Sequence, residues 1–195
     1  MILAFHSIWS CYGFWLPNEP RGSWSKFVAS WELFRFGPAT TVTTRRSIAH
    51  HQYDRSIKRE MLATLQHDPV RLTGEQAKVV GESLQLLPYV SLALAVMPNH
   101  VHAVIAHTSR NIRKVVGHIK SEATRNLREQ GWFSEHSPWG DHGWNVYLDS
   151  DDDVRRAIDY VNHNPVREGL PKQKWNCVIP FEPGALEAAR RKRRG

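Results

Sequence analysis

Cysteine is scarce in this chain: the 195 residues include only Cys11 and Cys177, far apart and without a Cys-x-x-Cys spacing. This argues against a disulfide scaffold or a zinc ribbon and predicts a reducing compartment. No apolar run approaches the roughly 20 residues that a membrane-spanning helix needs. The first residues, 1–6, lack the basic start and the small-residue cleavage site of a signal peptide. We therefore expect a cytoplasmic protein with no membrane partner.

The composition is that of an ordinary globular protein, with 41% hydrophobic and 23% charged residues. We expect one domain over residues 1–181 with an aromatic loop insertion near 12–51. A basic tail follows at 182–195, which we expect to be disordered. Five basic residues at 190–194 account for much of the net charge, which falls from +7 to +2 without them. The positive charge is therefore local, and its position matters more than its total.

Periodicity and breaker residues predict an α+β fold. A split βαβ (ferredoxin-like) antiparallel sheet covered by helices fits the order of elements best. Thr73 and Gln76 form a capping-box pattern at the start of one helix, and Pro165 should end the last helix near His163. The predicted strands are 2–9, 89–96, 100–106 and 145–148, and the predicted helices are 53–66, 73–87 and 111–130. A last helix is predicted to begin within the N-capping and acidic residues 149–153 and to run to about 163.

A short stretch, Met97-Pro98-Asn99-His100-Val101-His102, lies between two apolar runs. Pro98-Asn99 is a turn signal, so we expect a β-hairpin with both histidines at the start of its second strand. Residues i and i+2 of a strand point to the same side, so the two imidazoles should lie side by side. They would offer two metal ligands and leave room for a third ligand and a substrate. The alternative is a pair of strand histidines satisfied by hydrogen bonds.

Tyr160 and Asn164 are four residues apart near the end of the last predicted helix, so they share one helix face. The Asn164 carbonyl is a candidate third ligand for Mg²⁺ or Mn²⁺, which accept oxygen and imidazole together. A metal bound to a phosphodiester would allow Tyr160 to attack phosphorus, giving a phosphotyrosine and a released 3′-hydroxyl. Taken singly, Tyr160 fits a half-buried helix tyrosine and Asn164 a helix cap before proline.

The helix at 111–130 has a buried apolar stripe, with Arg113, Lys120, Thr124 and Arg128 on the opposite side. This side, with Lys114, is a candidate phosphate-binding face. A solvated outer helix face explains the same pattern equally well.

The histidine stretch together with Tyr160-Val161-Asn162-His163-Asn164-Pro165-Val166-Arg167 resembles the one-tyrosine HUH transposases, in the branch of REP-associated tyrosine transposases. Tyr12–Pro17, Arg21–Trp24 and Ile119–Ser121 also look like that branch. The resemblance implies metal-dependent cleavage and joining of single-stranded DNA through Tyr160, with His100 and His102 as metal ligands. Asn164 matches an amide position that is often Gln in the family.

The resemblance further implies an HUH-type fold, recognition of imperfect DNA hairpins, and location at the nucleoid through DNA binding. Arg21 joins the candidate DNA-binding residues on this ground. The sequence is compatible with a monomer and with a homodimer. Two other functions fit parts of the pattern: a catalytically silent hairpin-binding protein derived from a mobile element, and a His-x-His amidohydrolase. Amidohydrolases are barrels of about 250 residues, so this chain is too short for one.

Overall fold

The computed structural model describes residues 2–14, 55–182 and 184. Its centre is a four-stranded antiparallel sheet in the order β2-β3-β1-β4. This is the strand order of two interleaved split βαβ units, so the predicted ferredoxin-like topology is confirmed. The strands are β1 (Ala4–Cys11), β2 (Ser91–Val96), β3 (His100–Ala106) and β4 (Trp139–Leu148).

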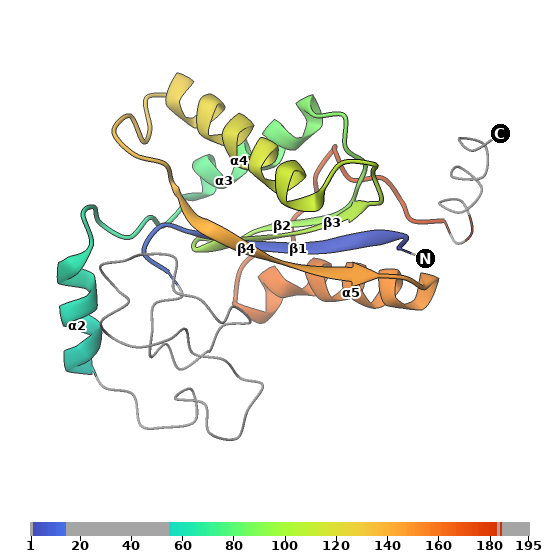
Figure 1. Ribbon diagram of the computed structural model, residues 1–195, viewed down its shortest axis with the longest axis horizontal. Coiled ribbons are helices and arrows are strands. Elements are labelled where there is room, and N and C mark those ends of the chain that lie inside the picture. The colour runs from blue at the N-terminus through green and yellow to red at the C-terminus, as the bar shows by residue number, and fades with distance from the viewer. Residues whose placement is uncertain (1, 15–54, 183, 185–195) are drawn as a thin grey trace.

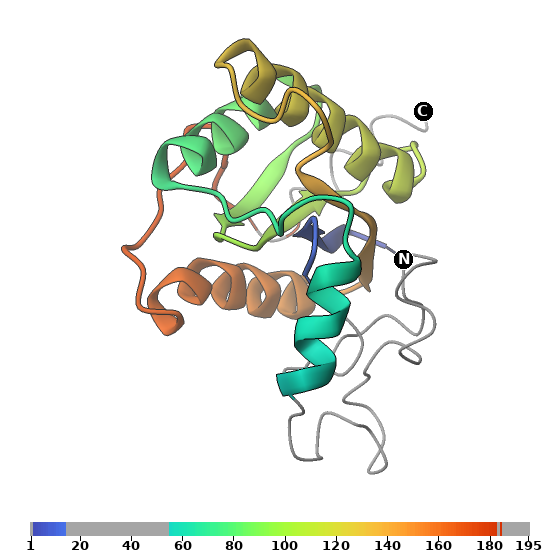
Figure 2. The same ribbon diagram turned by 90° about the vertical axis from the view of Figure 1, so that its left-hand side faces the viewer.

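The helices cover both faces of the sheet (Figures 1 and 2). Helices α3 and α4 lie on one face and α5 lies on the other, while α2 lies to one side. Each covered face has its own hydrophobic cluster, so the sheet is buried between two cores. No helix of the described part is long and apolar enough to cross a membrane. The helices are α2 (Arg55–Thr64), α3 (Gly74–Ser83) continued by the 3₁₀ turn η2 (Leu84–Leu86), α4 (Ile112–Glu129) and α5 (Asp151–Arg167).

Two expected segments, the aromatic loop near 12–51 and the basic tail at 182–195, lie almost wholly outside the described residues. Both cysteines are described, and both are free thiols.

The central strand β1 is buried along its whole length, because it is paired on both edges and covered on both faces. Successive side chains of β1 point to opposite faces of the sheet and therefore belong to different cores. Phe5 and Trp9 belong to the cluster beneath α3 and α4, whereas Ala4 belongs to the cluster beneath α5. The side chains of His6 and Ile8 follow the alternation of Ala4 and point to the α5 side.

The helix starts follow local sequence signals. Thr73 and Gln76 form the predicted capping box. The Thr73 hydroxyl accepts the Gln76 N–H at 3.3 Å, and the Gln76 side-chain oxygen accepts the Thr73 N–H at 2.9 Å. Asn111 caps α4 and Ser150 caps α5, each through a side-chain oxygen that accepts a backbone N–H. These contacts satisfy amides that have no partner within the helix.

The prediction that Pro165 ends the last helix near His163 was wrong, because α5 continues to Arg167 with Pro165 inside it. Proline removes one hydrogen bond, the one its own N–H would make. In the last turn this loss is tolerated, because Glu168 still donates its N–H to the Asn164 carbonyl at 3.2 Å. Gly169, at φ +74°, then turns the chain away.

Strand β4 begins at Trp139, six residues earlier than the strand predicted at 145–148. Glycine and polar residues made residues 131–143 resemble a loop. The pairing with β1 explains the glycine at position 143, because a Cβ there would lie 2.7 Å from the Ile8 carbonyl oxygen. Gly143 therefore marks a close backbone approach inside a strand.

The segment after α5 returns along β2. The Gln173 amide makes two hydrogen bonds to the Val96 backbone, accepting from its N–H at 2.8 Å and donating to its carbonyl at 2.7 Å. Further on, the Ile179 N–H donates to the Ser91 carbonyl at 3.0 Å. Between these points the Trp175 ring packs directly on Gly81 of α3. The segment thus ties the end of α5 to the sheet edge and to α3.

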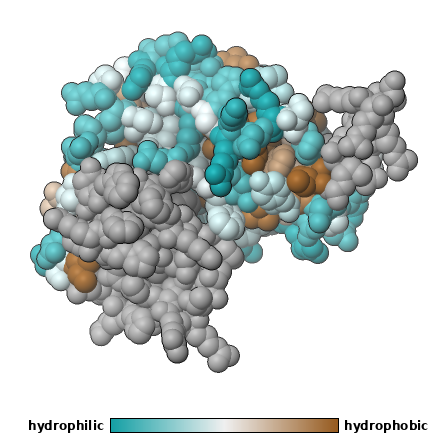
Figure 3. All heavy atoms as spheres, viewed as in Figure 1, coloured by the Kyte–Doolittle hydropathy of each residue, from teal (hydrophilic) through white to brown (hydrophobic). Residues whose placement is uncertain are grey.

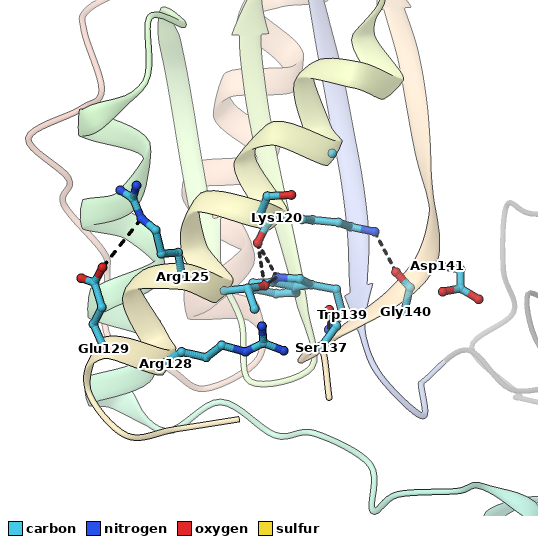
Figure 4. Close-up of a pocket in the computed structure, with 11 residues that line it drawn as sticks. Lys120, Arg125, Arg128, Glu129, Ser137, Trp139, Gly140 and Asp141 are labelled. Carbon is cyan, nitrogen blue, oxygen red and sulfur yellow. Dashed lines mark hydrogen bonds and ion pairs between the residues drawn. The ribbon is translucent and has the colours of Figure 1, made fainter. Parts of the chain in front are cut away.

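Helix α4 and strand β4 line a groove of about 760 Å³ (Figure 4). Lys120 extends across it and donates to the Gly140 carbonyl at 2.7 Å, while the Trp139 indole donates to Thr124 at 3.0 Å. Lys120 and Thr124 therefore face β4, which corrects the prediction that they lie on the outer side of the helix. Burial lowers the pKa of Lys120 to about 8, against smaller opposing effects of Asp141 and Cys11.

The contact between Gly81 and Trp175 generates a stability prediction. A Cβ at position 81 would lie 2.1 Å from a Trp175 ring carbon, so we expect Gly81→Ala to lower the free energy of unfolding by about 1–3 kcal/mol. The matched control is Gly117→Ala in α4, where a Cβ meets nothing within 4 Å. That change should raise stability by about 0.4–1 kcal/mol. Denaturant titration measures both, and equal effects would contradict the packing.

A second prediction follows from Lys120. The folded protein releases this proton near pH 8, whereas an unfolded lysine holds it to about 10.5. The unfolded state therefore binds more protons above pH 8, and stability rises with pH there. We expect the unfolding free energy of the wild type, relative to Lys120→Met, to increase from pH 7 to pH 9. A pH-independent difference between the two proteins would show that Lys120 is not desolvated.

Candidate functional site

The histidine pair begins β3, as the sequence predicted. His100 and His102 are 7% and 4% exposed and project from the sheet face that α5 covers. Val101 between them projects to the other face and is buried beneath α3 and α4. The turn before the pair is closed by a hydrogen bond of 2.8 Å from the Met97 N–H to the His100 carbonyl. The two imidazoles are thus held on rigid, paired backbone.

The His100 ring is oriented by the turn residue before it. Its Nδ1 lies 2.7 Å from the Asn99 side-chain oxygen, and Asn99 is itself buried. Because an amide oxygen only accepts, Nδ1 carries the proton and the lone pair of the ring is on Nε2. Asn99 therefore fixes which nitrogen of His100 can bind a metal.

A third histidine, His6 of β1, belongs to the same cluster, and it was not among the residues predicted from the sequence. His6 lies opposite Val104 in the ladder and diagonally across from His102. Its Nε2 is 3.0 Å from His102 Nδ1. The two residues are 96 positions apart, so only the pairing of β1 with β3 brings them together.

Burial keeps His6 and His102 neutral. It lowers the pKa of His6 to about 4, and it lowers the pKa of His102 to about 2 with smaller contributions from the charges of His100 and His6. A neutral imidazole is the form that binds a metal ion. His6 and His102 are therefore in the protonation state that coordination requires.

Tyr160 of α5 lies against the histidines. Its ring centroid is 5.6 Å from that of His102 and 5.8 Å from that of His6, and its side chain is 42% exposed. The guanidinium of Arg167, the last residue of α5, lies 5.5 Å from the Tyr160 ring centroid. The phenol can thus contact both the buried histidines and a substrate arriving from solvent.

Asn164 is one turn beyond Tyr160 and is 7% exposed. It continues the stripe of α5 that is buried against the sheet, after Val154 and Val161. Its amide nitrogen is buried and has no hydrogen-bond partner among the described residues.

These residues fit a divalent metal by their chemistry. Two neutral imidazoles and an amide oxygen are a donor set that Mg²⁺ or Mn²⁺ accepts. Within the described residues, no three His, Cys, Asp or Glu side chains are grouped to hold a metal ion. Asn164 is buried on the face of α5 that packs against the sheet, so its amide oxygen is the candidate third donor beside His100 and His102.

The candidate DNA-binding residues are not gathered around the histidines. Arg113, Lys114 and Arg128 are exposed on α4, which lies on the opposite face of the sheet. The visible surface over α4 is mostly hydrophilic (Figure 3). Arg128 also donates to the Phe133 carbonyl at 3.0 Å, and Lys120 lies in the groove beside β4. Arg21 lies outside the described residues.

Part of the chain is similar to known proteins. Residues 76–152 match the family model described as "Transposase IS200 like". The matched stretch runs from α3 into α5 and contains both histidines of β3, whereas Tyr160 and Asn164 lie beyond it.

A Haemophilus influenzae protein named as a REP-associated tyrosine transposase is 23% identical over 92 residues. The alignment covers 42% of this chain and 52% of that protein, so the chain spans about half the length of this curated relative. Among solved structures, a REP-associated tyrosine transposase bound to a REP hairpin aligns with a TM-score of 0.43 at 21% identity. That alignment covers 56% of this chain and 66% of the other. Residues 76–152 are thus similar to the IS200-like transposases, and the chain is distantly similar to a REP-associated tyrosine transposase.

Proposed function

We propose that this protein is a metal-dependent transposase and single-strand endonuclease that cleaves and rejoins DNA at hairpin-flanked sites through Tyr160. The observation that carries the proposal is the position of Tyr160, whose ring lies 5.6 Å from the ring of His102. A phenol held beside buried, neutral imidazoles is suited to a metal-assisted attack on phosphorus.

His100, His102 and Asn164 would hold the divalent ion, Mg²⁺ or Mn²⁺. When bound, such an ion polarises the phosphoryl group and neutralises the negative charge that develops on it. The role of these three residues is to fix the position of the ion beside the nucleophile. Asn99 contributes by holding the His100 ring in one orientation through the 2.7 Å contact.

Tyr160 is the nucleophile in this proposal. Its phenolic oxygen forms a bond to phosphorus while the bond from phosphorus to the 3′ oxygen breaks. The phenol gives up its proton and the 3′ oxygen gains one, so the products are a 5′-phosphotyrosine and a free 3′-hydroxyl. Attack of a 3′-hydroxyl on the adduct reverses the same bond changes and rejoins the strand. The bond energy is kept in the adduct, so rejoining needs no external energy source.

The substrate class is inferred from the relatives. The matching family model and the name of the Haemophilus influenzae protein favour DNA of REP elements as the substrate. The resemblance of the histidine and tyrosine motifs adds single-stranded DNA with hairpins to this proposal. Arg113 and Lys114 on α4, with Arg128 and Arg21, are proposed to contact phosphates. Because α4 and the histidines lie on opposite faces of the sheet, hairpin binding and cleavage are proposed to use separate surfaces.

The covalent step generates the first functional prediction. With an end-labelled DNA hairpin and Mn²⁺, Tyr160→Phe should reduce the SDS-resistant protein–DNA adduct by about 10³-fold or more, because only the nucleophilic oxygen is removed. Hairpin affinity, measured by gel shift, should be largely unchanged. The matched control is Tyr147→Phe on β4, a tyrosine that is 58% exposed and packs its edge against Phe5 on the other face. An equal adduct in wild type and Tyr160→Phe would contradict the assignment.

The proposed metal seat, formed by His100, His102 and Asn164, generates a second prediction. His100→Ala should abolish Mn²⁺-dependent cleavage, and a chelator should do the same to the wild type, because one of three ligands is lost. His118→Ala on α4 is the control, since that histidine contacts Tyr89 on the opposite face. Cleavage that survives in His100→Ala would remove this residue from the metal seat. Hairpin binding by the wild type without any adduct would instead favour a catalytically silent hairpin-binding protein.

A further inference from the structure

We propose that His6 is a positioning residue for the metal seat: it accepts the His102 Nδ1–H and so makes His102 present Nε2 to the metal. This proposal rests on the proposed function, because it takes His102 to be a ligand. His6 comes from β1, outside the stretch of residues that matches the transposase family model.

The first support is the contact itself. His6 Nε2 and His102 Nδ1 are 3.0 Å apart, and the residues are 9% and 4% exposed. The rings are tilted by 30° with centroids 5.3 Å apart, so they approach through their nitrogen edges rather than stacking. Between two neutral imidazoles, one nitrogen must donate and the other must accept.

Only one direction of this hydrogen bond allows His102 to bind a metal through Nε2. If His102 Nδ1–H donates, the lone pair of the ring is on Nε2 and can point at the ion. If His6 Nε2–H donates instead, His102 carries its proton on Nε2, and neither of its nitrogens is available. His6 in the tautomer protonated on Nδ1 therefore keeps His102 in the ligating form.

The second support is the parallel with His100. Each histidine of β3 has its Nδ1 engaged by a buried neighbour: the Asn99 oxygen at 2.7 Å for His100 and the His6 nitrogen at 3.0 Å for His102. The Asn99 contact leaves Nε2 of His100 for the metal, and the His6 contact does the same for His102 when His102 Nδ1–H is the donor. A third histidine ligand would instead require the three rings to converge, and no such group of three occurs among the described residues.

The test measures Mn²⁺ affinity without DNA, by electron paramagnetic resonance of the free ion. His6→Leu replaces the accepting imidazole by an apolar side chain of similar bulk. This change should weaken Mn²⁺ binding by about 10–100-fold. His6→Gln places an amide oxygen near the original Nε2 and should retain affinity within a few-fold of wild type. The matched control is Ile8→Val, on the same strand and face and paired opposite His102. Thermal melts confirm that each variant is folded.

A second readout reports the tautomer directly. Long-range ¹H–¹⁵N spectra of the metal-free protein should show His102 protonated on Nδ1 in the wild type and in His6→Gln, and a shift toward protonation on Nε2 in His6→Leu. A merely structural role for His6 would leave unchanged the ratio of the two His102 tautomers, protonated on Nδ1 or on Nε2.

The outcomes separate the two proposals. Equal Mn²⁺ affinity in wild type and His6→Leu, with His100→Ala impaired, would overturn the role of His6 alone. Loss of binding in both His6→Leu and His6→Gln, to the extent seen in His100→Ala, would make His6 a ligand and also overturn the positioning role. Equal binding by wild type and His100→Ala would overturn the metal seat, and the role of His6 with it.

Discussion

The register between β1 and β3 is the constraint on which the site depends. Ser10 lies opposite His100 and Ile8 opposite His102, so the histidines face α5. A slip of β3 by one residue would turn them toward α3 and α4 and would turn Val101 toward α5. Val101 is fully buried in the core beneath α3 and α4, opposite Trp9 in the ladder. Apolar packing on one side of the sheet thus holds the polar cluster in place on the other.

The parts of the fold that depend on neighbouring residues could be predicted from the sequence. The turn at Pro98-Asn99 and the capping box of Thr73 and Gln76 are set by residues a few positions apart. The i, i+2 relation of His100 and His102 is local in the same way. The resemblance predicted that Tyr160 belongs to the same site as this pair, and in the structure the Tyr160 ring lies against the His102 ring.

Features that depend on distant segments could not be predicted in this way. His6 gains its partner through a ladder between strands that are far apart in the chain. The sequence pattern predicts Lys120 on an outer helix face, but β4 covers that flank and the Gly140 carbonyl accepts a hydrogen bond from the Lys120 amino group. The breaking effect of Pro165 was overestimated, because a proline in a last turn removes only one hydrogen bond.

The double hydrogen bond of Gln173 to Val96 has a consequence for how copies of the chain can associate. An exposed edge strand is a template on which another polypeptide can extend the sheet. On β2 that template is occupied at one end by Gln173 and at the other by Ile179, which donates to Ser91. An incoming strand would have to displace both contacts before it could pair along β2. The segment that follows α5 therefore also hinders aggregation through pairing of the β2 edge with a strand of another molecule.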